Sequence, residues 1–203
     1  MGVVNCIGKT YDVENREREG HRMKYVNKLN GDRIYLSPMQ VEDAETYVRW
    51  LSDPLVTDGL GNTCRVMSVE DEKEWIKKNA GTNQFAIIRK ADHQLLGNCG
   101  LHQIDALRQC AEVGLFIGEA ENRGKGYGVE VLNLLLAHAF DTLNLNNVML
   151  RVFSFNENAI RCYGKVGFRE MGRRRQSYYV RGQFHDEVFM DILKADFNRM
   201  RGM

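Results

Sequence analysis

A glycine-rich turn with two basic residues carries the clearest chemical signal in this sequence. The run Arg-Gly-Lys-Gly-Tyr-Gly at 123–128 lies between an expected strand and a long expected helix. Glycines leave the backbone N–H groups uncovered, so a phosphate can approach them, and the helix N-terminus adds roughly half a positive charge there. Arg123 and Lys125 add side-chain charge. The turn predicts a pyrophosphate site, and a ligand-free turn is the alternative.

Two better-known phosphate motifs do not fit this spacing. A P-loop needs Ser or Thr after its lysine, whereas Gly126 follows Lys125. A dinucleotide fingerprint needs its third glycine one position later and an acidic residue further on, and residues 144–147 contain none. Nucleotide binding is therefore the weaker interpretation.

A second motif begins about 30 residues after the first. Residues 156–168 read Asn-Glu-Asn-Ala-Ile-Arg-Cys-Tyr-Gly-Lys-Val-Gly-Phe. With Arg123, Gly126 and Gly128 in their spacing, this run resembles the signature of the GNAT superfamily of N-acetyltransferases. The similarity covers about 33–194 and is closest to the RimJ/RimL-like branch, which holds ribosomal-protein N-terminal and spermidine acetyltransferases.

The resemblance implies a fold and an activity. The fold is an α/β GNAT fold, with a mixed, mostly antiparallel central sheet of about 6–7 strands flanked by about 4 helices. The expected activity is transfer of an acetyl group from acetyl-CoA to a primary amine, either a protein N-terminal α-amino group or a small amine. Polyamine or aminoglycoside acetylation, and a non-catalytic acyl-CoA sensor, are the alternatives.

The resemblance also assigns cofactor-binding residues. The backbone of one strand, at Leu115, Phe116 and Ile117, is expected to pair with the pantetheine arm. Asn156 and Asn158 begin the second motif, where Asn156 either caps a helix or contacts the pantetheine amide. The pyrophosphate loop comprises Arg123, Gly124, Lys125, Gly126, Tyr127 and Gly128.

Two residues are the catalytic candidates. By resemblance, Tyr163 is the acid that protonates the leaving thiolate, with packing as its alternative role. Glu112 is the candidate base through a water, or else forms an edge salt bridge, and His102 is a weaker alternative base. Cys162 has no neighbouring pattern that would activate a nucleophile, so direct transfer is favoured.

The acceptor sets how much catalysis is needed. A lysine-like amine costs roughly 4.6 kcal/mol to deprotonate at pH 7, and an α-amino group only about 1 kcal/mol. Residues 57–66 are expected to form a loop that shapes the acceptor cleft, and residues 173–175 an exposed basic strand face. The acidic residues that a polyamine site could use are Glu42, Asp43, Glu45, Asp53 and Asp58.

Periodicity predicts the elements that position these residues. Residues 1–30 are charged and read as an N-terminal extension, while 31–203 form a single domain. Two final strands bracket the turn at Arg181-Gly182, the second covering 187–192. Helices are expected at 40–51, 68–79, 124–143 and 156–166, and strands at 33–36, 85–89, 95–104, 111–117 and 148–153.

Composition limits the partners. The 203 residues carry a net charge of +1, which argues against direct nucleic-acid binding, and no apolar stretch is long enough to span a membrane. The five cysteines show no CxxC spacing, so free thiols in the cytoplasm and no metal site are expected. The expected partners are acetyl-CoA and an amine acceptor, and a homodimer is compatible with the sequence.

Overall fold

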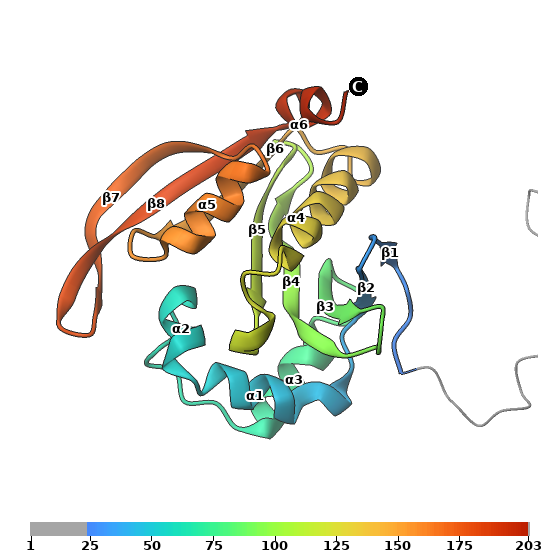
Figure 1. Ribbon diagram of the computed structural model, residues 1–203, viewed down its shortest axis with the longest axis vertical. Coiled ribbons are helices and arrows are strands. Elements are labelled where there is room, and N and C mark those ends of the chain that lie inside the picture. The colour runs from blue at the N-terminus through green and yellow to red at the C-terminus, as the bar shows by residue number, and fades with distance from the viewer. Residues whose placement is uncertain (1–23, 203) are drawn as a thin grey trace, which may run out of the picture.

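The computed structural model describes residues 24–202, which form one layered α/β unit (Figure 1). The strands are β1 (Leu29–Asn30), β2 (Ile34–Pro38), β3 (Gln84–Arg89), β4 (Leu95–Asp105), β5 (Cys110–Ile117), β6 (Asn147–Phe153), β7 (Arg169–Val180) and β8 (Gln183–Leu193). The helices are α1 (Ala44–Leu51), α2 (Pro54–Leu60), α3 (Val69–Lys78), α4 (Tyr127–Ala137), α5 (Glu157–Lys165) and α6 (Lys194–Met200). Short 3-10 turns lie at Val41–Asp43 and Ala120–Asn122, and a π-helical stretch at His138–Thr142 extends α4.

The strands form one sheet in the order β1-β2-β3-β4-β5-β6-β8-β7. Neighbours pair antiparallel except β5 and β6, which pair in parallel because α4 provides the crossover between them. This confirms the predicted mixed, mostly antiparallel sheet, although the described residues contain eight strands and six α-helices, slightly more than expected.

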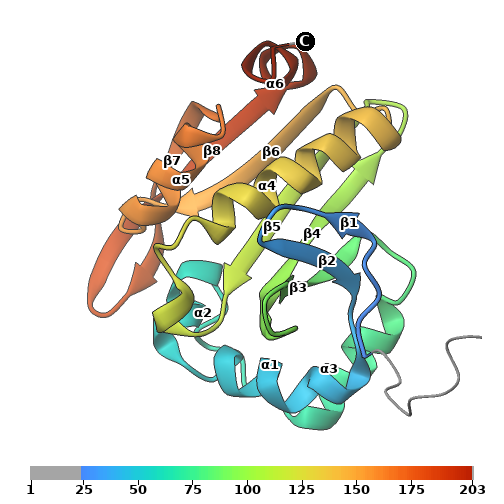
Figure 2. The same ribbon diagram turned by 45° about the vertical axis from the view of Figure 1, so that its right-hand side comes forward.

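Side-chain alternation divides the buried residues between the two faces of the sheet. On one face, here called the α4 face, Ile34, Leu36 and Ile87 pack with α4 and α5 around Leu132 and Leu135. Figure 2 shows α4 and α5 lying over the strands. This cluster is the larger of the two and mainly aliphatic, and each member is at most 9% exposed, so it supplies most of the apolar burial that stabilises the fold.

The opposite face, here called the α1 face, is smaller and more aromatic. Tyr35 and Ile88 point to this side and pack with Tyr47 and Trp50 of α1 and with α3. The rings of Tyr47, Trp50 and Phe116 meet edge to face, with centroids 5.8 to 6.5 Å apart. Phe116 brings the end of β5 into this cluster.

Residues 57–66 were predicted to form a loop, and this is wrong for 57–60, because α2 covers Pro54–Leu60. The Asp53 side chain accepts a hydrogen bond from Leu55 N at 2.9 Å, Pro54 occupies the first helical turn, and Gly61 ends the helix at φ +71°. Proline lacks an N–H and has a fixed φ, so it can stop one helix and start the next. The Asp53-Pro54 pair was interpreted correctly as the end of α1, but its second role as the start of α2 was missed.

Two other elements were not predicted. β1 is two residues long, and α6 packs Phe197 against the ring of Phe140, with centroids 5.5 Å apart. By contrast, the Ser68 cap of α3 and the hairpin turn at Arg181-Gly182 are confirmed.

The first described residues contact the domain. Lys24 and Tyr25 bind the buried Asp43 carboxylate, and Val26 N donates to Ser37 Oγ at 3.0 Å. Residues 24–30, assigned from sequence to the extension, therefore pack against α1 and β2, whereas 1–23 lie outside the described residues. None of the helices within 24–202 is both long and apolar enough to cross a membrane.

Candidate functional site

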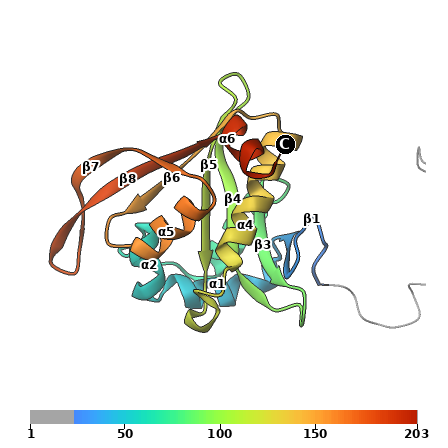
Figure 3. The ribbon, with the colours of Figure 1, turned by 45° about the horizontal axis from the view of Figure 1, so that its top comes forward.

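The site is built around a gap between β5 and β6. Their parallel pairing ends at Glu112 opposite Met149, although β5 continues to Ile117 and β6 to Phe153. Beyond that point β6 leads away towards the β7–β8 hairpin (Figure 3). Among the described strands, the last residues of β5 therefore pair only with β4.

Backbone alternation identifies the groups of β5 that face this gap. Gly118 N donates to Leu96 O at 2.9 Å, and a Cβ on Gly97 would lie 2.0 Å from Phe116 O. The backbone N–H and C=O groups of Phe116 and Gly118 therefore point towards β4. The backbone groups of Leu115 and Ile117, which alternate with them, point into the gap. An extended ligand can add here as a strand.

The glycine turn lies directly before α4. Gly124 has φ +72° and Gly126 has φ +85°, a left-handed region that favours glycine. Within the described part of the chain, no acceptor takes the N–H groups of Tyr127, Gly128 and Val129. These free donors and the positive end of the helix dipole give the turn the chemistry that an anion site needs.

The two basic residues of the turn differ in what they do. The guanidinium of Arg123 is turned back, donating from Nε to Ile117 O at 3.1 Å and from Nη2 to Gly118 O at 2.6 Å. It therefore braces the end of β5 rather than projecting from the turn. Lys125 is exposed, and its side chain is free to reach an anion.

Arg33 is a residue that sequence reasoning missed at this site. Its Nη1 donates to Lys125 O at 2.9 Å, its Nε to Glu130 Oε2 at 3.1 Å, and its guanidinium lies 4.9 Å from the Tyr127 ring centroid. Arg33 directly precedes β2, about 90 residues before the turn, so no local pattern could have joined them. It places a third positive charge beside the turn.

α5 packs closely on the first turn of α4. A Cβ on Gly128 would lie 3.3 Å from Cys162 Sγ, so this glycine allows the approach of the two helices. The Cys162 thiol is half-buried, and burial raises its pKa, which does not favour a nucleophilic thiolate.

Tyr163 lies on the side of α5 that packs against the main core. Its ring centroid is 6.0 Å from that of Phe168, and no residue among 24–202 bonds to its hydroxyl. Burial, with the Cys162 thiol as a smaller contribution, raises the pKa of Tyr163. The hydroxyl therefore stays protonated at neutral pH and can donate a proton.

The two asparagines of the second motif have local partners. Asn156 Oδ1 accepts from Ala159 N at 3.2 Å, so the predicted N-cap role is present. Its Nδ2 faces α2 and would lie 3.1 Å from a Cβ on Gly59. Asn158 is exposed and accepts from Arg161 Nη2 at 2.5 Å.

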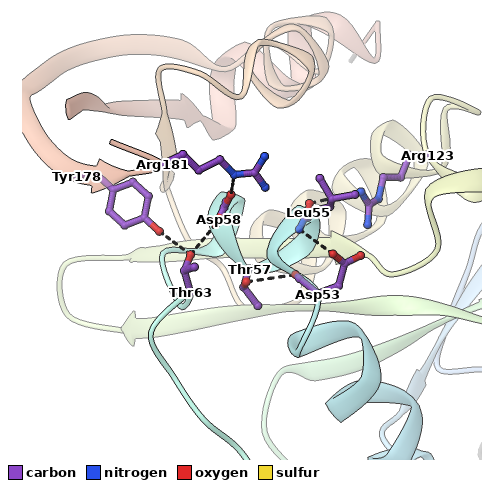
Figure 4. A network of polar contacts seen from close by, with 8 residues as sticks. All are labelled: Asp53, Leu55, Thr57, Asp58, Thr63, Arg123, Tyr178 and Arg181. Carbon is purple, nitrogen blue, oxygen red and sulfur yellow. Dashed lines mark hydrogen bonds and ion pairs between the residues drawn. The ribbon is translucent and has the colours of Figure 1, made fainter. Parts of the chain in front are cut away.

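α2 links the turn to the β7–β8 hairpin (Figure 4). Asp58 is buried and accepts from Arg181 Nε at 2.7 Å and from Thr63 Oγ1 at 2.8 Å, while Thr63 also contacts the Tyr178 hydroxyl. On the other side, Arg123 reaches Leu55 O at 3.5 Å. Asp58 and Thr63, in the segment expected to shape the acceptor cleft, are thus tied to the hairpin, and Leu55 just before it is tied to Arg123.

Glu112 lies on the α1 face in a row of charges. It accepts from Arg151 Nε at 2.8 Å, and Arg151 Nη1 is 3.6 Å from Glu187. The salt bridge considered from sequence is therefore present. His102 lies opposite Glu112 on β4, and Gln84 Nε2 is 3.2 Å from its Nδ1.

The ring of His102 faces β5. An amide nitrogen only donates, so Nδ1 accepts and the neutral ring carries its proton on Nε2, which lies nearest Gly114. Desolvation lowers the pKa of His102, partly offset by Glu112. In this tautomer His102 is a hydrogen-bond donor.

A cleft of about 270 Å³ opens on the α1 face beside the end of β5. Leu115 and Phe116 form one wall, and Tyr47, Trp75 and Glu72 come from α1 and α3. The carboxylates named from sequence lie elsewhere. Asp43 binds Lys24 and Tyr25, Asp53 caps α2, Asp58 binds Arg181, and Glu42 and Glu45 do not line the cleft.

Comparison with known proteins agrees with this geometry. Residues 33–169 match the acetyltransferase (GNAT) domain family. The uncharacterized N-acetyltransferase p20 of Bacillus licheniformis is 28% identical over 175 residues, covering 83% of this chain and 97% of p20. YdaF of Bacillus subtilis (strain 168), provisionally named a ribosomal N-acetyltransferase, is 32% identical over 124 residues, covering 61% of this chain and 67% of YdaF.

Solved structures share the fold. The crystal structure of spermidine N-acetyltransferase from Vibrio cholerae in complex with CoA and spermine superimposes with a TM-score of 0.74 at 22% identity, covering 81% of this chain and 98% of that one. Since the family match spans more than half of the sequence, the chain belongs to the GNAT acetyltransferases, as its two motifs predicted.

Proposed function

We propose that the chain transfers an acetyl group from acetyl-CoA to a primary amine, either the α-amino group of a protein N-terminus or a small amine. The observation that carries the proposal is the unpaired edge of β5 ending next to a glycine turn with free N–H groups. An extended pantetheine arm fits the first and a pyrophosphate fits the second.

The chain's own residues supply the following roles. The N–H groups of Tyr127 to Val129, with Lys125 and Arg33, bind the pyrophosphate, while the backbone of Leu115 and the N–H of Ile117, whose carbonyl accepts from Arg123, hold the arm. Acetyl-CoA supplies a thioester, whose C–S bond breaks as the amine nitrogen forms a bond to the acyl carbon. Tyr163 gives its proton to the departing sulfur, and Glu112 takes the amine's proton through a water.

Glu112 has a competing role as the partner of Arg151. Arg151 Nε donates to Glu112 Oε1 at 2.8 Å, so a bridging water would bind the carboxylate beside this ion pair. The need for this base depends on the acceptor, since an α-amino group is far cheaper to deprotonate than a lysine-like amine.

The test combines donor binding with product detection. Calorimetry should detect acetyl-CoA binding, and mass spectrometry should detect acetylated product from a panel holding peptides with free N-termini, spermidine and aminoglycosides. Absence of acetyl-CoA binding would contradict the proposal. Binding without product from any acceptor would favour an acyl-CoA sensor.

A further inference from the structure

Glu72 is a buried carboxylate that lines the cleft and has no partner among the described residues. Its side chain is 3% exposed, and within 24–202 no donor or cation bonds to it. Its neighbours on α3 are satisfied, since Glu70 pairs with Lys73 and Asp71 accepts from Ser68. The other deeply buried acids, Asp43 and Asp58, also have partners.

A second unpartnered group lies in the same wall. Tyr47 is 1% exposed, and its hydroxyl has no hydrogen-bond partner in the described part of the chain. Burial raises its pKa, and Glu72 is one of the nearby acids that add to this. Because buried polar groups are almost always hydrogen-bonded, an acceptor and a hydroxyl left open in one wall point to a ligand.

The rest of the lining defines the ligand. Leu51, Leu60, Met67 and Trp75 make the walls largely apolar. Of the described residues that line the cleft, Glu72 is the one carboxylate, whereas Arg65 adds a positive charge at the rim. One buried negative charge beside a rim cation suits a ligand with one positive charge and disfavours one with several.

The cleft also touches the proposed reaction site. Gly114, Leu115 and Phe116 of β5 form its far wall, and Leu115 faces the gap in which the pantetheine arm is proposed to lie. A group bound by Glu72 is therefore held on the side of β5 from which an acceptor can approach.

We propose that this cleft selects a primary amine with a single positive charge and an apolar body, and that Glu72 binds its ammonium group as it enters. This inference rests on the proposed acetyl transfer, which makes the cleft the binding site of the acceptor amine. The ammonium offsets the cost of burying a lone carboxylate, and the Tyr47 hydroxyl accepts from one of its N–H groups. Arg65 repels a second positive charge.

Binding of three probes to the CoA-saturated protein tests the proposal by calorimetry. Phenethylamine has the expected charge and body, 2-phenylethanol has the body alone, and spermidine has several charges. Phenethylamine should bind at least tenfold more tightly than either other probe. Glu72→Gln should lose at least tenfold in affinity for phenethylamine and little for 2-phenylethanol, because removing one member of a buried charge pair is costly.

The matched control is Glu70→Gln, on the same helix but outside the cleft, which should change each affinity less than twofold. Tighter binding of spermidine, absence of phenethylamine binding, or equal phenethylamine affinity in Glu72→Gln and the unmodified protein would each overturn the proposal. Should Glu72→Gln not fold, Glu72→Asp, which withdraws the charge by one methylene, should show a smaller loss in the same direction.

Repeating the titrations without CoA separates the two proposals. If acetyl-CoA does not bind but phenethylamine still depends on Glu72, the acetyl transfer is wrong and the amine site stands. If acetyl-CoA binds and amines are acetylated with an unchanged KM in Glu72→Gln, the transfer stands and the role of Glu72 is wrong.

Discussion

The two faces of the central sheet differ in how completely they are satisfied. The α4 face carries the larger, mainly aliphatic core, in which residues such as Leu132 and Leu135 are fully buried. The α1 face mixes aromatic rings with buried polar groups. Among the described residues the Tyr47 hydroxyl has no hydrogen-bond partner, and Glu72 is 3% exposed without a bonded donor or cation. Stability is concentrated on the first face, and unsatisfied polarity marks the second as the one that receives a ligand.

The proposed reaction draws on both faces. The turn before α4 and Tyr163 of α5 belong to the α4 face, whereas the cleft, His102 and Glu112 belong to the α1 face. β5 connects them because its strand edge opens into the gap at Leu115 while Phe116 packs against α1. Donor and acceptor can therefore be perturbed separately.

Gly126→Val should have the largest effect and should act on the donor alone. Gly126 has φ +85°, and a Cβ there would lie 3.2 Å from Arg33 Nη2 and cover the free N–H groups. Acetyl-CoA affinity, measured by calorimetry, should fall by more than roughly a hundredfold. Gly182→Val, at φ +82° in the distant hairpin turn, carries the same backbone strain and should leave affinity unchanged.

Tyr163→Phe should separate chemistry from binding on the α4 face. Turnover should fall by roughly tenfold or more, while acetyl-CoA affinity changes less than twofold, because only the hydroxyl is removed. Tyr179→Phe, which alters an exposed tyrosine of the hairpin, is the control. Unchanged turnover in Tyr163→Phe would leave the residue with a packing role.

Glu112→Gln should have an effect that depends on the acceptor. With a lysine-like amine, turnover should fall roughly tenfold or more, and with a peptide α-amino group the loss should be much smaller, because the second amine needs less help to lose its proton. Steady-state kinetics with both acceptors measures the difference. A lower melting temperature with no kinetic change would restrict Glu112 to its ion pair with Arg151.

Glu72→Gln should produce the smallest effect, a gain in stability that depends on pH. Burial raises the pKa of Glu72 above its ordinary value of 4.5, partly offset by Arg65. A folded-state pKa above the unfolded value means that Glu72 favours folding below pH 4.5 and that this contribution is lost as pH rises through the folded pKa. Glutamine does not ionise, so Glu72→Gln should not lose stability in this way as the pH rises.

The measurement is the melting temperature of ligand-free protein at two pH values. Glu72→Gln should melt higher than the unmodified protein at pH 7.5, by roughly 2 °C or more, and the difference should shrink at pH 4. A lower melting temperature at pH 7.5 would instead indicate that Glu72 has a stabilising partner in the fold, and the contrast between the two faces would weaken.

The donor side of this protein could be predicted from sequence because its signals are local. A phosphate turn depends on glycines at fixed spacing and on the helix that follows them, and the N-cap of α5 depends on Asn156 and a residue three positions on. Strand and helix periodicity likewise identified the order of the major elements, since it reflects which side chains each element buries.

Local signals also misled. Asp53-Pro54 signalled the end of one helix while serving as the start of α2, and Arg123, counted as a phosphate ligand from its charge, uses that charge on the carbonyls of Ile117 and Gly118. A side chain's type limits what it can do, but its direction depends on neighbours that the local sequence does not contain.

Sequence alone determined the family and the position of the glycine turn, while the tertiary structure decided which charges lie near the proposed site. Arg33 joins the turn from about 90 residues away, and Glu72, one of several acids on a short helix, is the one directed into the cleft. Asp43, Asp53 and Asp58 proved to be bonded within the fold. The reason is physical, because the burial and pairing of a charge are set by contacts between distant segments, which a single sequence leaves unspecified.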